Sequence, residues 1–362
     1  MVIFVDKETM TVIISKNGKN AQKVESSSFD YEDNLQAYID DNPNAIPMYE
    51  IKEDARVLVL AREFSTQSGP IDALGIDQDG EIYIIETKLY KNSDKRTVCA
   101  QALDYGASLW KSSIDFSDFV YQIDNYLSKK EGTSCIEKIK TFYELESADN
   151  LLESIKENLN HGNFKFIVLM DQLDSRLKDL ILFINENSKF DIYAIEFDYY
   201  KYEEMEIIIP KLYGTEVKKS ITSAGSTSSR RVWNDDSFWE DAESKLDENQ
   251  LQSLRDLYDF AKKNAEVTWG TGSVSGSFNP KHIKISPRSF FTFFSNGAMS
   301  INFGYLNDDD QRNQLLRIIK KSSLSPSVII TKDLAHSYPT LKADIVSKYK
   351  DEIIKIWEEF IS

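Results

Sequence analysis

The segment Gly69–Lys88, GPIDALGIDQDGEIYIIETK, decides the fold of the first part of the chain. It contains two apolar runs rich in isoleucine, Ile71–Ile76 and Ile82–Glu86, separated by a stretch that includes Gln78-Asp79-Gly80. These three residues are typical of a three-residue hairpin loop, in which glycine takes the left-handed backbone conformation. The segment therefore predicts a β-hairpin.

The register of this hairpin decides which charged residues meet. With the three-residue loop, Asp72 faces Glu86, and Lys88 shares their face because side chains alternate along a strand. A two-residue loop would place Asp72 opposite Thr87 and separate the charges. We expect the first register, with Asp72, Glu86 and Lys88 together at the open end of the hairpin.

Two carboxylates and an ammonium group beside apolar residues are costly unless they bind something. Asp72 and Glu86 form a hard-cation site suited to Mg²⁺ or Mn²⁺. Such a metal can bind a phosphate oxygen and acidify a water molecule, while Lys88 orients the water and stabilises developing negative charge. The alternative is a surface ion pair of Glu86 and Lys88 at the end of a strand.

Three flanking residues extend this cluster. Gln101 and Tyr105 are four residues apart in 94–110, a stretch with the spacing of an amphipathic helix, so they share one helix face. Glu32 begins a helix predicted over 31–40 and is a candidate further metal ligand. The alternatives are a core position for Tyr105 and a helix-dipole interaction for Glu32.

The runs Pro70-Ile71-Asp72, Glu86-Thr87-Lys88 and Gln101-Ala102-Leu103-Asp104-Tyr105 resemble the PD-(D/E)XK nuclease superfamily. The QxxxY pattern is that of its RecB-type and lambda-exonuclease-type branches. The upstream helix and the hairpin are also similar to the mismatch-endonuclease group. The resemblance covers residues 31–110 and is looser over 164–210.

This resemblance implies a restriction-endonuclease-like α/β fold, a mixed sheet flanked by helices, and hydrolysis of DNA phosphodiester bonds by metal-activated water. It implies that Asp72 and Glu86 bind Mg²⁺ (or Mn²⁺). The main-chain carbonyl of Thr87 and the carboxylate of Glu32 would complete the metal shell. The implied biological context is restriction, repair or phage defence.

The resemblance also implies roles for the residues around the metal. Lys88 would position the attacking water, while Gln101 and Tyr105 would order the site and contact the phosphate backbone. Three nearby basic residues either hold phosphates or form a solvated face: Lys91, Lys95 and Arg96.

The charge of the chain is unevenly distributed. The 362 residues carry a net charge of −16. Up to Thr215 there are 23 Lys and Arg against 39 Asp and Glu, and from Glu216 there are 20 against 20. An acidic protein does not coat polyanions non-specifically. Either the second part of the chain grips DNA, or the substrate is small or occasional, or the site is degenerate.

The chain divides at a stretch rich in Ser, Thr and Gly, KKSITSAGSTSSRR over 218–231, which predicts a linker. We expect a nuclease-like region over 1–215, with its core over 28–112, a linker over 216–232, and an α+β domain over 233–362. In the first region we expect a hairpin of Val2–Val5 with Thr11–Ile14, and strands and helices interleaved thereafter.

In the α+β domain we expect a helix over Ser237–Lys263 and strands at Ile283–Ile285, Phe290–Phe294 and Met299–Phe303. Basic residues here are interspersed with aromatic ones, which suits nucleic-acid binding, although the phenylalanines are alternatively core residues. The candidate phosphate contacts of the linker and this domain are Arg230, Arg231, Lys281, Lys284 and Arg288.

Composition narrows the class of protein. Two cysteines without a CxxC motif and three scattered histidines exclude a disulfide framework and a zinc-thiolate site, and suit the cytoplasm. No apolar run reaches the length of a membrane span, so no membrane partner is expected. DNA is the expected partner, with RNA and a homodimer left open. The rival function is a catalytically silent nucleic-acid-binding or nucleotide-sensing module on the same fold.

Overall fold

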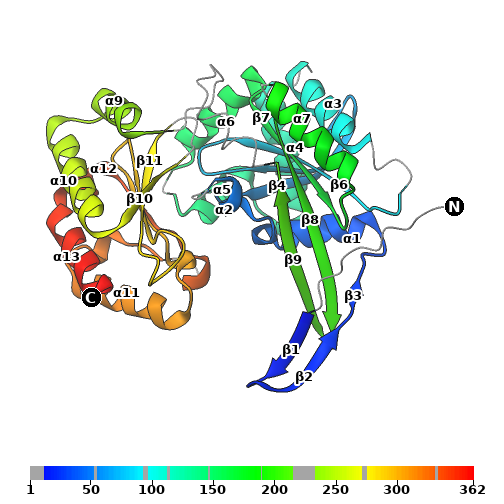
Figure 1. The fold of residues 1–362 in the computed structure, drawn as a ribbon. Coiled ribbons are helices and arrows are strands. Elements are labelled where there is room, and N and C mark those ends of the chain that lie inside the picture. Colours follow the sequence, from blue (N-terminus) through cyan, green and yellow to red (C-terminus); the bar gives the residue numbers. More distant parts are fainter. Residues whose placement is uncertain are drawn as a thin grey trace.

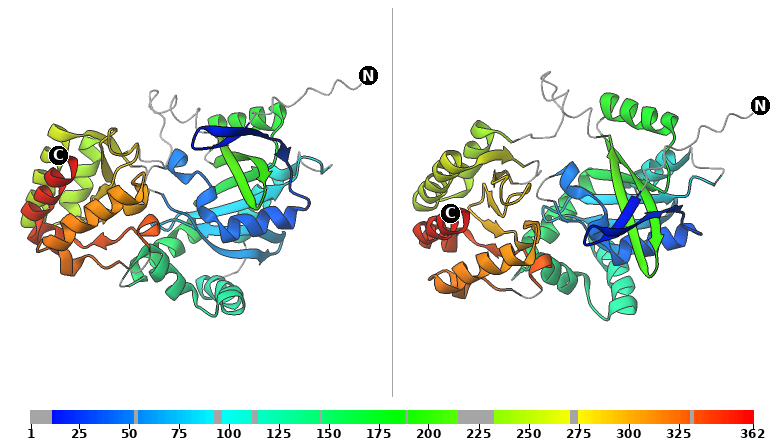
Figure 2. Two further views of the ribbon diagram at one scale, coloured as in Figure 1. Left: turned by 90° about the horizontal axis from the view of Figure 1, so that it is seen from below. Right: turned by 60° about the horizontal axis from the view of Figure 1, so that its bottom comes forward.

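The computed structural model describes residues 12–52, 55–92, 97–111, 115–145, 147–188, 190–214, 233–270, 275–330 and 333–362. These residues form an N-terminal body and a C-terminal body that lie side by side (Figures 1 and 2). Each body has a sheet and helices, so the mixed α/β class is confirmed. The predicted linker lies outside the described residues, and so does the predicted strand at Val2–Val5.

The predicted hairpin is present inside a seven-stranded mixed sheet, as β5 (Gly69–Ile76) and β6 (Ile82–Lys88). On one side, β4 (Leu58–Thr66) pairs antiparallel with β5. On the other side, β7 (Phe164–Met170) pairs parallel with β6. Because β6 has a neighbour along both edges, the residues that end it emerge from the interior of the sheet.

The sheet continues with β8 (Asp191–Tyr202), which is parallel to β7. Both β9 (Met205–Tyr213) and the short β3 (Ser26–Ser27) pair antiparallel with β8. A separate two-stranded ribbon precedes the sheet, and its strands are β1 (Val12–Lys16) and β2 (Lys19–Val24).

Helices cover both faces of this sheet (Figure 1). On one face, α1 (Glu32–Asp41) contributes Leu35 and Ile39 to an apolar core that includes Tyr83 and Ile85 of β6. On the other face lies α3 (Val98–Lys111), whose apolar stripe shares a larger core with the alternate residues of β5 and β6. The same larger core includes residues of α4 (Phe116–Glu131), α5 (Cys135–Tyr143), α6 (Asp149–His161) and α7 (Ser175–Asn187).

Two short helices connect α1 to β4: the 3-10 helix Pro43–Ala45 and α2 (Met48–Ile51). The segment after α2 contains Lys52 and Arg56, which contact the turn of the hairpin.

The predicted helices at 31–40 and 94–110 are confirmed, and the second begins at Val98 among the described residues.

The C-terminal body is built on a five-stranded antiparallel sheet. Its strands, in order, are β10 (Glu266–Trp269), β11 (Ser277–Lys281), β12 (Phe291–Phe294), β13 (Met299–Ile301) and β14 (Thr340–Leu341). Its helices are α9 (Asp235–Lys245), α10 (Glu248–Asn264), α11 (Asp309–Lys321), α12 (Ala343–Lys348) and α13 (Lys350–Ile361). Short 3-10 helices lie at Phe303–Tyr305, Ser325–Ser327 and Leu334–His336.

Two predictions for this body are wrong. Ile283–Ile285 is a turn rather than a strand, because the backbone N–H groups of Ile285 and Ser286 both bond to the carbonyl of His282. The stretch Ser237–Lys263 is two helices, since the chain breaks at Leu246 and Asp247 caps the second helix. The aromatic residues are core: Trp357, Phe291 and Phe293 lie in one buried cluster, and Trp233 and Phe290 belong to it as well.

The hairpin turn has the predicted three-residue form. Gly80 has a φ of +79°, its N–H bonds to the carbonyl of Asp77 at 3.1 Å, and Asp77 N–H bonds to the carbonyl of Glu81 at 3.2 Å. Ile76 accordingly faces Ile82, as the three-residue loop requires. The predicted register of the hairpin is confirmed along this ladder.

We predict that Gly80→Ala destabilises the fold more than Gly132→Ala does. Both glycines have positive φ, which costs an L-residue about 1–2 kcal/mol. A Cβ at Gly80 would also lie 2.7 Å from Ser154 Cβ, whereas nothing lies within 4 Å of one at Gly132. We expect about 1–3 kcal/mol of additional loss at Gly80 from this overlap, measured by denaturant unfolding. Equal losses at the two positions would contradict the close packing of α6 on the turn.

Candidate functional site

The open end of the hairpin is held together by the Asp72 carboxylate. The β5–β6 ladder runs to the pair of Ala73 and Ile85. Beyond that pair, Asp72 Oδ2 accepts hydrogen bonds from the N–H of Thr87 at 2.8 Å and from its hydroxyl at 2.7 Å. The predicted register thus brings Asp72 to the end of β6, where it binds Thr87.

Gln36, on the buried side of α1, orients this carboxylate. Its side chain hydrogen-bonds to Asp72. Its carbonyl Oε1 accepts from Arg62 Nη2 at 3.2 Å, and the same Arg62 nitrogen donates to Asp33 at 2.6 Å. Because Arg62 occupies the carbonyl of Gln36, the amide NH₂ is the end that remains for Asp72. Sequence reasoning missed Gln36, although it lies one helical turn after Glu32.

Glu32 binds the segment that follows β6. Its Oε1 accepts from the N–H of Leu89 at 3.1 Å and from the side-chain amide of Asn92, and lies 3.6 Å from Lys88 Nζ. These contacts show Glu32 fixing the exit of β6 and pairing with Lys88. Its proposed role as a metal ligand remains a prediction.

Glu86, Thr87 and Lys88 are all buried. Glu86 is 3% exposed and Lys88 is 8% exposed. Their positions in the parallel ladder are opposite Val168, Leu169 and Met170 of β7. Charged side chains are rarely buried to this degree unless they are paired or bind a ligand. The surface ion pair at an exposed strand end is therefore not what the structure contains.

Tyr105 lies close to the acidic residues. Burial raises the pKa of Tyr105 to about 12, and the charges of Glu86, Asp72 and Glu63 act in the same direction. A Cβ at Gly69 would lie 3.6 Å from its ring, so the ring packs on the start of β5. Tyr105 also belongs to the apolar core, as the alternative interpretation expected, and its role at the site stays a prediction.

Gln101 is less closely involved. Its Oε1 accepts a hydrogen bond from the Thr97 hydroxyl at 3.3 Å, within the same helix end. It shares the α3 face that carries Tyr105 one turn later. The catalytic role of Gln101 stays a prediction.

Glu63 is an acidic residue that the sequence did not single out. It has a φ of +51°, the left-handed region, between the β4–β5 pairs Arg62–Ala73 and Phe64–Ile71. Burial raises the pKa of Glu63, and the Asp72 charge raises it further. Non-glycine residues in this conformation often mark functional positions. Because Glu63 alone leaves the extended conformation inside β4, the pattern of apolar residues in the sequence does not reveal it.

The residues present suit a hard cation with few protein ligands. No group of three or more His, Cys, Asp or Glu side chains in the described ranges is arranged to hold a metal. Mg²⁺, however, commonly binds through one or two carboxylates and keeps several waters. Asp72 Oδ2 accepts hydrogen bonds from Thr87, and Glu86 provides a second, buried carboxylate. This donor set fits Mg²⁺ or Mn²⁺ and does not fit a fully protein-liganded site.

The structure gives the positions of some of the predicted phosphate-binding residues, and their role stays a prediction. Lys91 is exposed and donates to the carbonyl of Asp30 at 2.5 Å. In the C-terminal body, Lys281 ends β11, Lys284 is exposed in the turn, and the Arg288 guanidinium lies 3.3 Å from the centroid of the Tyr305 ring. The remaining candidates lie outside the described residues: Lys95, Arg96, Arg230 and Arg231.

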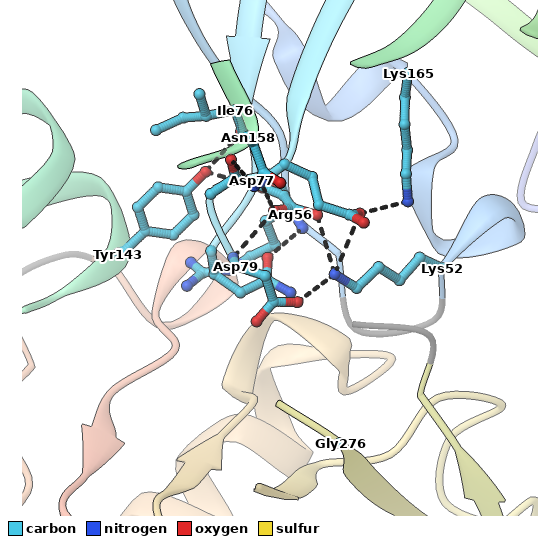
Figure 3. Close-up of polar contacts among 12 residues, drawn as sticks. Lys52, Arg56, Ile76, Asp77, Asp79, Tyr143, Asn158, Lys165 and Gly276 are labelled. Carbon is cyan, nitrogen blue, oxygen red and sulfur yellow. Dashed lines mark hydrogen bonds and ion pairs between the residues drawn. The ribbon is translucent and has the colours of Figure 1, made fainter. Parts of the chain in front are cut away.

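A buried ionic cluster lies at the turn end of the hairpin, and no sequence pattern predicted it (Figure 3). Lys52, 2% exposed, has its Nζ 3.0 Å from Asp77 Oδ2 and 3.6 Å from Glu81 Oε2, and it also pairs with Asp79. Lys165 on β7 binds Glu81 at 2.5 Å. We call these five residues the Lys52 cluster.

Asp77 is the acceptor at the centre of the Lys52 cluster. Besides Lys52, it accepts from the N–H groups of Asp79 and Glu81, each at 3.0 Å, and from the hydroxyl of Tyr83 at 3.1 Å. Burial raises the pKa of Asp77, while the ammonium of Lys52 acts in the opposite direction. Four donors to one carboxylate tie α2, the turn and β6 together.

The same turn contacts α5 and the C-terminal body. The Tyr143 hydroxyl donates to the carbonyl of Ile76 at 2.8 Å, and Arg56 N–H donates to Gln78 at 3.0 Å. The Arg56 guanidinium lies 4.0 Å from the centroid of the Tyr338 ring. The hairpin therefore spans the N-terminal body from the candidate site to the contact with the C-terminal body.

Comparison with protein-family models, with curated proteins and with solved structures returned no match. Within the described ranges, no helix combines the length and apolar character of a membrane-spanning segment.

We predict that Lys52→Met strongly destabilises the fold. The substitution leaves the carboxylates of Asp77 and Glu81 buried without their shared cation, and breaking such a pair typically costs about 3–5 kcal/mol. Lys156→Met is the matched control, since Lys156 pairs with Glu153 on an exposed helix face and such pairs contribute about 0–1 kcal/mol. Denaturant unfolding measures both. A small loss for Lys52→Met would show that the cluster contributes little.

A second prediction concerns the pH dependence of stability. Burial raises the pKa of Asp72, although the Thr87 hydrogen bonds oppose the shift. A raised carboxyl pKa means that this group's contribution to stability is full below the unfolded-state pKa and is lost as pH rises through the folded-state pKa. Asp72→Asn should therefore become more stable relative to wild type as pH rises from about 4 towards neutral. Thermal unfolding across this pH range checks the trend, and a pH-independent difference would contradict it.

Proposed function

We propose that the chain is a Mg²⁺-dependent nuclease with a restriction-endonuclease-like N-terminal body, which hydrolyses DNA phosphodiester bonds. The observation that carries the proposal is the burial of Glu86 and Lys88 at the end of a central strand, beside Asp72 and Tyr105. A structural ion pair does not need this concentration of acidic groups. A divalent cation would offset their mutual repulsion.

The residues have distinct parts in this proposal. The carboxylates of Asp72 and Glu86 would hold the cation, with the carbonyl of Thr87 as a further ligand. The cation would polarise the phosphate and lower the pKa of the attacking water. Lys88, held 3.6 Å from Glu32, is placed to hydrogen-bond that water or a phosphate oxygen.

Two neighbours support these groups. Gln36 holds the orientation of Asp72, because its side chain hydrogen-bonds to Asp72 and is itself held by Arg62. The pKa of Tyr105, raised to about 12, keeps its hydroxyl protonated at neutral pH, so it can donate a hydrogen bond to a phosphate oxygen. Gln101 is proposed to complete the phosphate contact from the same helix. DNA is the proposed substrate. We also propose a cytoplasmic location, which the free, buried thiols of Cys99 and Cys135 support.

One observation favours a second candidate function. Glu32 lies within ion-pair distance of Lys88, which reduces the positive charge available to a phosphate. A catalytically silent module that binds nucleic acid or a nucleotide would be compatible with that arrangement. DNA nicking and metal binding, measured together, separate the two functions.

We expect metal-dependent nicking of supercoiled DNA by the wild-type chain, and a loss of at least about a hundredfold in Glu86→Gln and Lys88→Met. Glu86→Gln removes a ligand of the cation, and Lys88→Met removes the group that contacts the attacking water or a phosphate oxygen. Glu153→Gln, on the exposed face of α6, is the control and should retain full activity. Circular dichroism and unfolding curves confirm that each variant is folded.

Two outcomes would count against hydrolysis. Equal nicking by wild type and both variants would assign the activity to another site or a contaminant. Absence of nicking, with calorimetric Mg²⁺ or Mn²⁺ binding also absent in wild type, would favour the silent module.

A further inference from the structure

The five-stranded sheet of the C-terminal body has one apolar face and one polar face. Thr268 pairs with Asn279, Thr292 pairs with Ser300, and Ser300 pairs with Thr340. Asn279 follows Phe278, whose partner is Phe293, so the ladder continues from Asn279 to Thr292. Paired residues share a face, so one polar side chain from each strand forms a continuous row. We call this row the polar face: Thr268, Asn279, Thr292, Ser300 and Thr340.

Asn279 has an unused donor within this face. Asn302 Nδ2 donates to the carbonyl of Ser289 at 3.0 Å and to the Thr292 hydroxyl at 3.0 Å. Because the Thr292 hydroxyl accepts this bond, its own proton is donated to Asn279 Oδ1 at 2.8 Å. This order of donors directs the NH₂ group of Asn279 away from Thr292. Asn279 Nδ2 forms no hydrogen bond with an acceptor in the described part of the chain, and the residue is 1% exposed.

A buried donor without an acceptor costs about 1–3 kcal/mol. Such a group in a folded protein points to a water or to a ligand. It projects from the polar face rather than into the apolar core, because Thr292 shares that face. Asn279 therefore indicates where an acceptor atom of a ligand would bind.

The edge of the polar face carries positive charge. Tyr338 precedes Thr340 by two residues and extends the face, and the Arg56 guanidinium of the N-terminal body lies over its ring. The Tyr305 ring lies 5.1 Å from the Tyr338 ring, and Arg288 covers the Tyr305 ring. Two guanidinium groups from different bodies thus flank a pair of tyrosines.

A third arginine is close by. Burial raises the pKa of Tyr338, and the charges of Arg56, Arg288 and Arg312 all act to lower it. Arg312 is held by the carbonyls of Phe303 and Leu306 and by Asp309. The carboxylate facing Tyr338, Glu144, already accepts from the N–H of Tyr338 at 2.9 Å. We call the three guanidinium groups the arginine edge.

Arg56 is the most available member of the arginine edge. Its guanidinium donates one long hydrogen bond, 3.4 Å, to the carbonyl of Phe142. The other contacts of this guanidinium in the described part of the chain are with the rings of Phe142, Tyr143 and Tyr338, and it forms no ion pair with a carboxylate there. An arginine on aromatic rings keeps its in-plane N–H groups for an anion, and guanidinium and phosphate match in a bidentate geometry.

The polar face and its edge lie between the two bodies. The Glu144–Tyr338 and Arg56–Tyr338 contacts both join the N-terminal body to this side of the sheet. Figure 1 shows the sheet on the side of the C-terminal body that faces the N-terminal body.

We propose that the polar face and the arginine edge form a binding site for a phosphate-bearing ligand, either a nucleotide or a nucleic-acid strand. Arg56 and Arg288 bind the phosphate, and Asn279 donates to an acceptor atom on the base or sugar. The charged edge and the uncharged hydroxyl and amide row match the two chemically different parts of a nucleotide unit. The site is separate from Asp72 and Glu86 and does not depend on hydrolysis.

The experiment measures binding by the full-length chain in EDTA, so that cleavage does not interfere. The probes are a short fluorescein-labelled single-stranded oligodeoxynucleotide, followed by anisotropy, and ATP and pyrophosphate, followed by calorimetry. We expect Arg56→Gln and Arg288→Gln each to weaken binding about tenfold or more, because each removes charge-assisted hydrogen bonds. Asn279→Ser should weaken the binding of the oligonucleotide or of ATP, and it should leave the binding of pyrophosphate unchanged.

Arg255→Gln is the matched control. Arg255 also lies over an aromatic ring, 4.3 Å from the centroid of Trp239, but on α10, which packs against the apolar face of the sheet. It should bind every probe as wild type does, and unfolding curves monitor the fold of each variant. Preference for ATP would identify a nucleotide and preference for the oligonucleotide a strand; both support the site.

The proposal would be overturned if wild type binds none of the probes, or if Arg56→Gln and Arg288→Gln bind as tightly as Arg255→Gln. In the latter case Arg56 serves only to join the two bodies through Tyr338, and Arg288 serves only to pack on Tyr305. Because the assay contains no divalent metal, its result is independent of whether the chain cleaves DNA.

Discussion

The ammonium of Lys52 is the group on which the arrangement of the N-terminal body depends. It lies completely inside the protein and is shared by Asp77, Asp79 and Glu81 at the turn of the central hairpin. Because these carboxylates are spaced at alternate residues, a shift of the turn by one residue would remove one of them from Lys52. The ion pairs at one end of the hairpin thus hold the register that places Asp72 beside the end of β6 at the other end.

The two ends of the hairpin differ in how their charges are balanced. At the turn, Lys52 and Lys165 oppose the three carboxylates, and Asp77 has four donors. At the open end, Glu86, Asp72 and Glu63 surround Tyr105, and the pKa shifts of Asp72 and Glu63 reflect carboxylates held in an unfavourable environment. Proteins keep such local instability where a ligand relieves it, and the well-bonded turn makes it tolerable.

Sequence reasoning succeeded where the chemistry is local. The Gln78-Asp79-Gly80 loop and the alternation of isoleucines were enough to pair Ile76 with Ile82 and to bring Asp72 to the end of β6. It failed where a contact depends on distant segments: Gln36 reaches Asp72, and Lys52 reaches the turn, only after α1 and α2 have packed. Ile283–Ile285 has the composition of a strand, but the backbone bonds to His282 fold it into a turn. The restriction-endonuclease-like assignment itself rests on motif spacing and remains a proposal.

The unequal distribution of tryptophan between the two bodies has a practical consequence. Of the five tryptophans, Trp110 alone lies in the N-terminal body and is exposed, whereas Trp233 and Trp357 are buried in the C-terminal core. Intrinsic indole fluorescence will therefore report almost entirely on the melting of the C-terminal body. The N-terminal body, rich in buried tyrosine, will be nearly silent at the same wavelength. Optical unfolding curves and calorimetric curves of this chain can consequently differ even when both are correct, and their separation will show how tightly the two bodies are coupled.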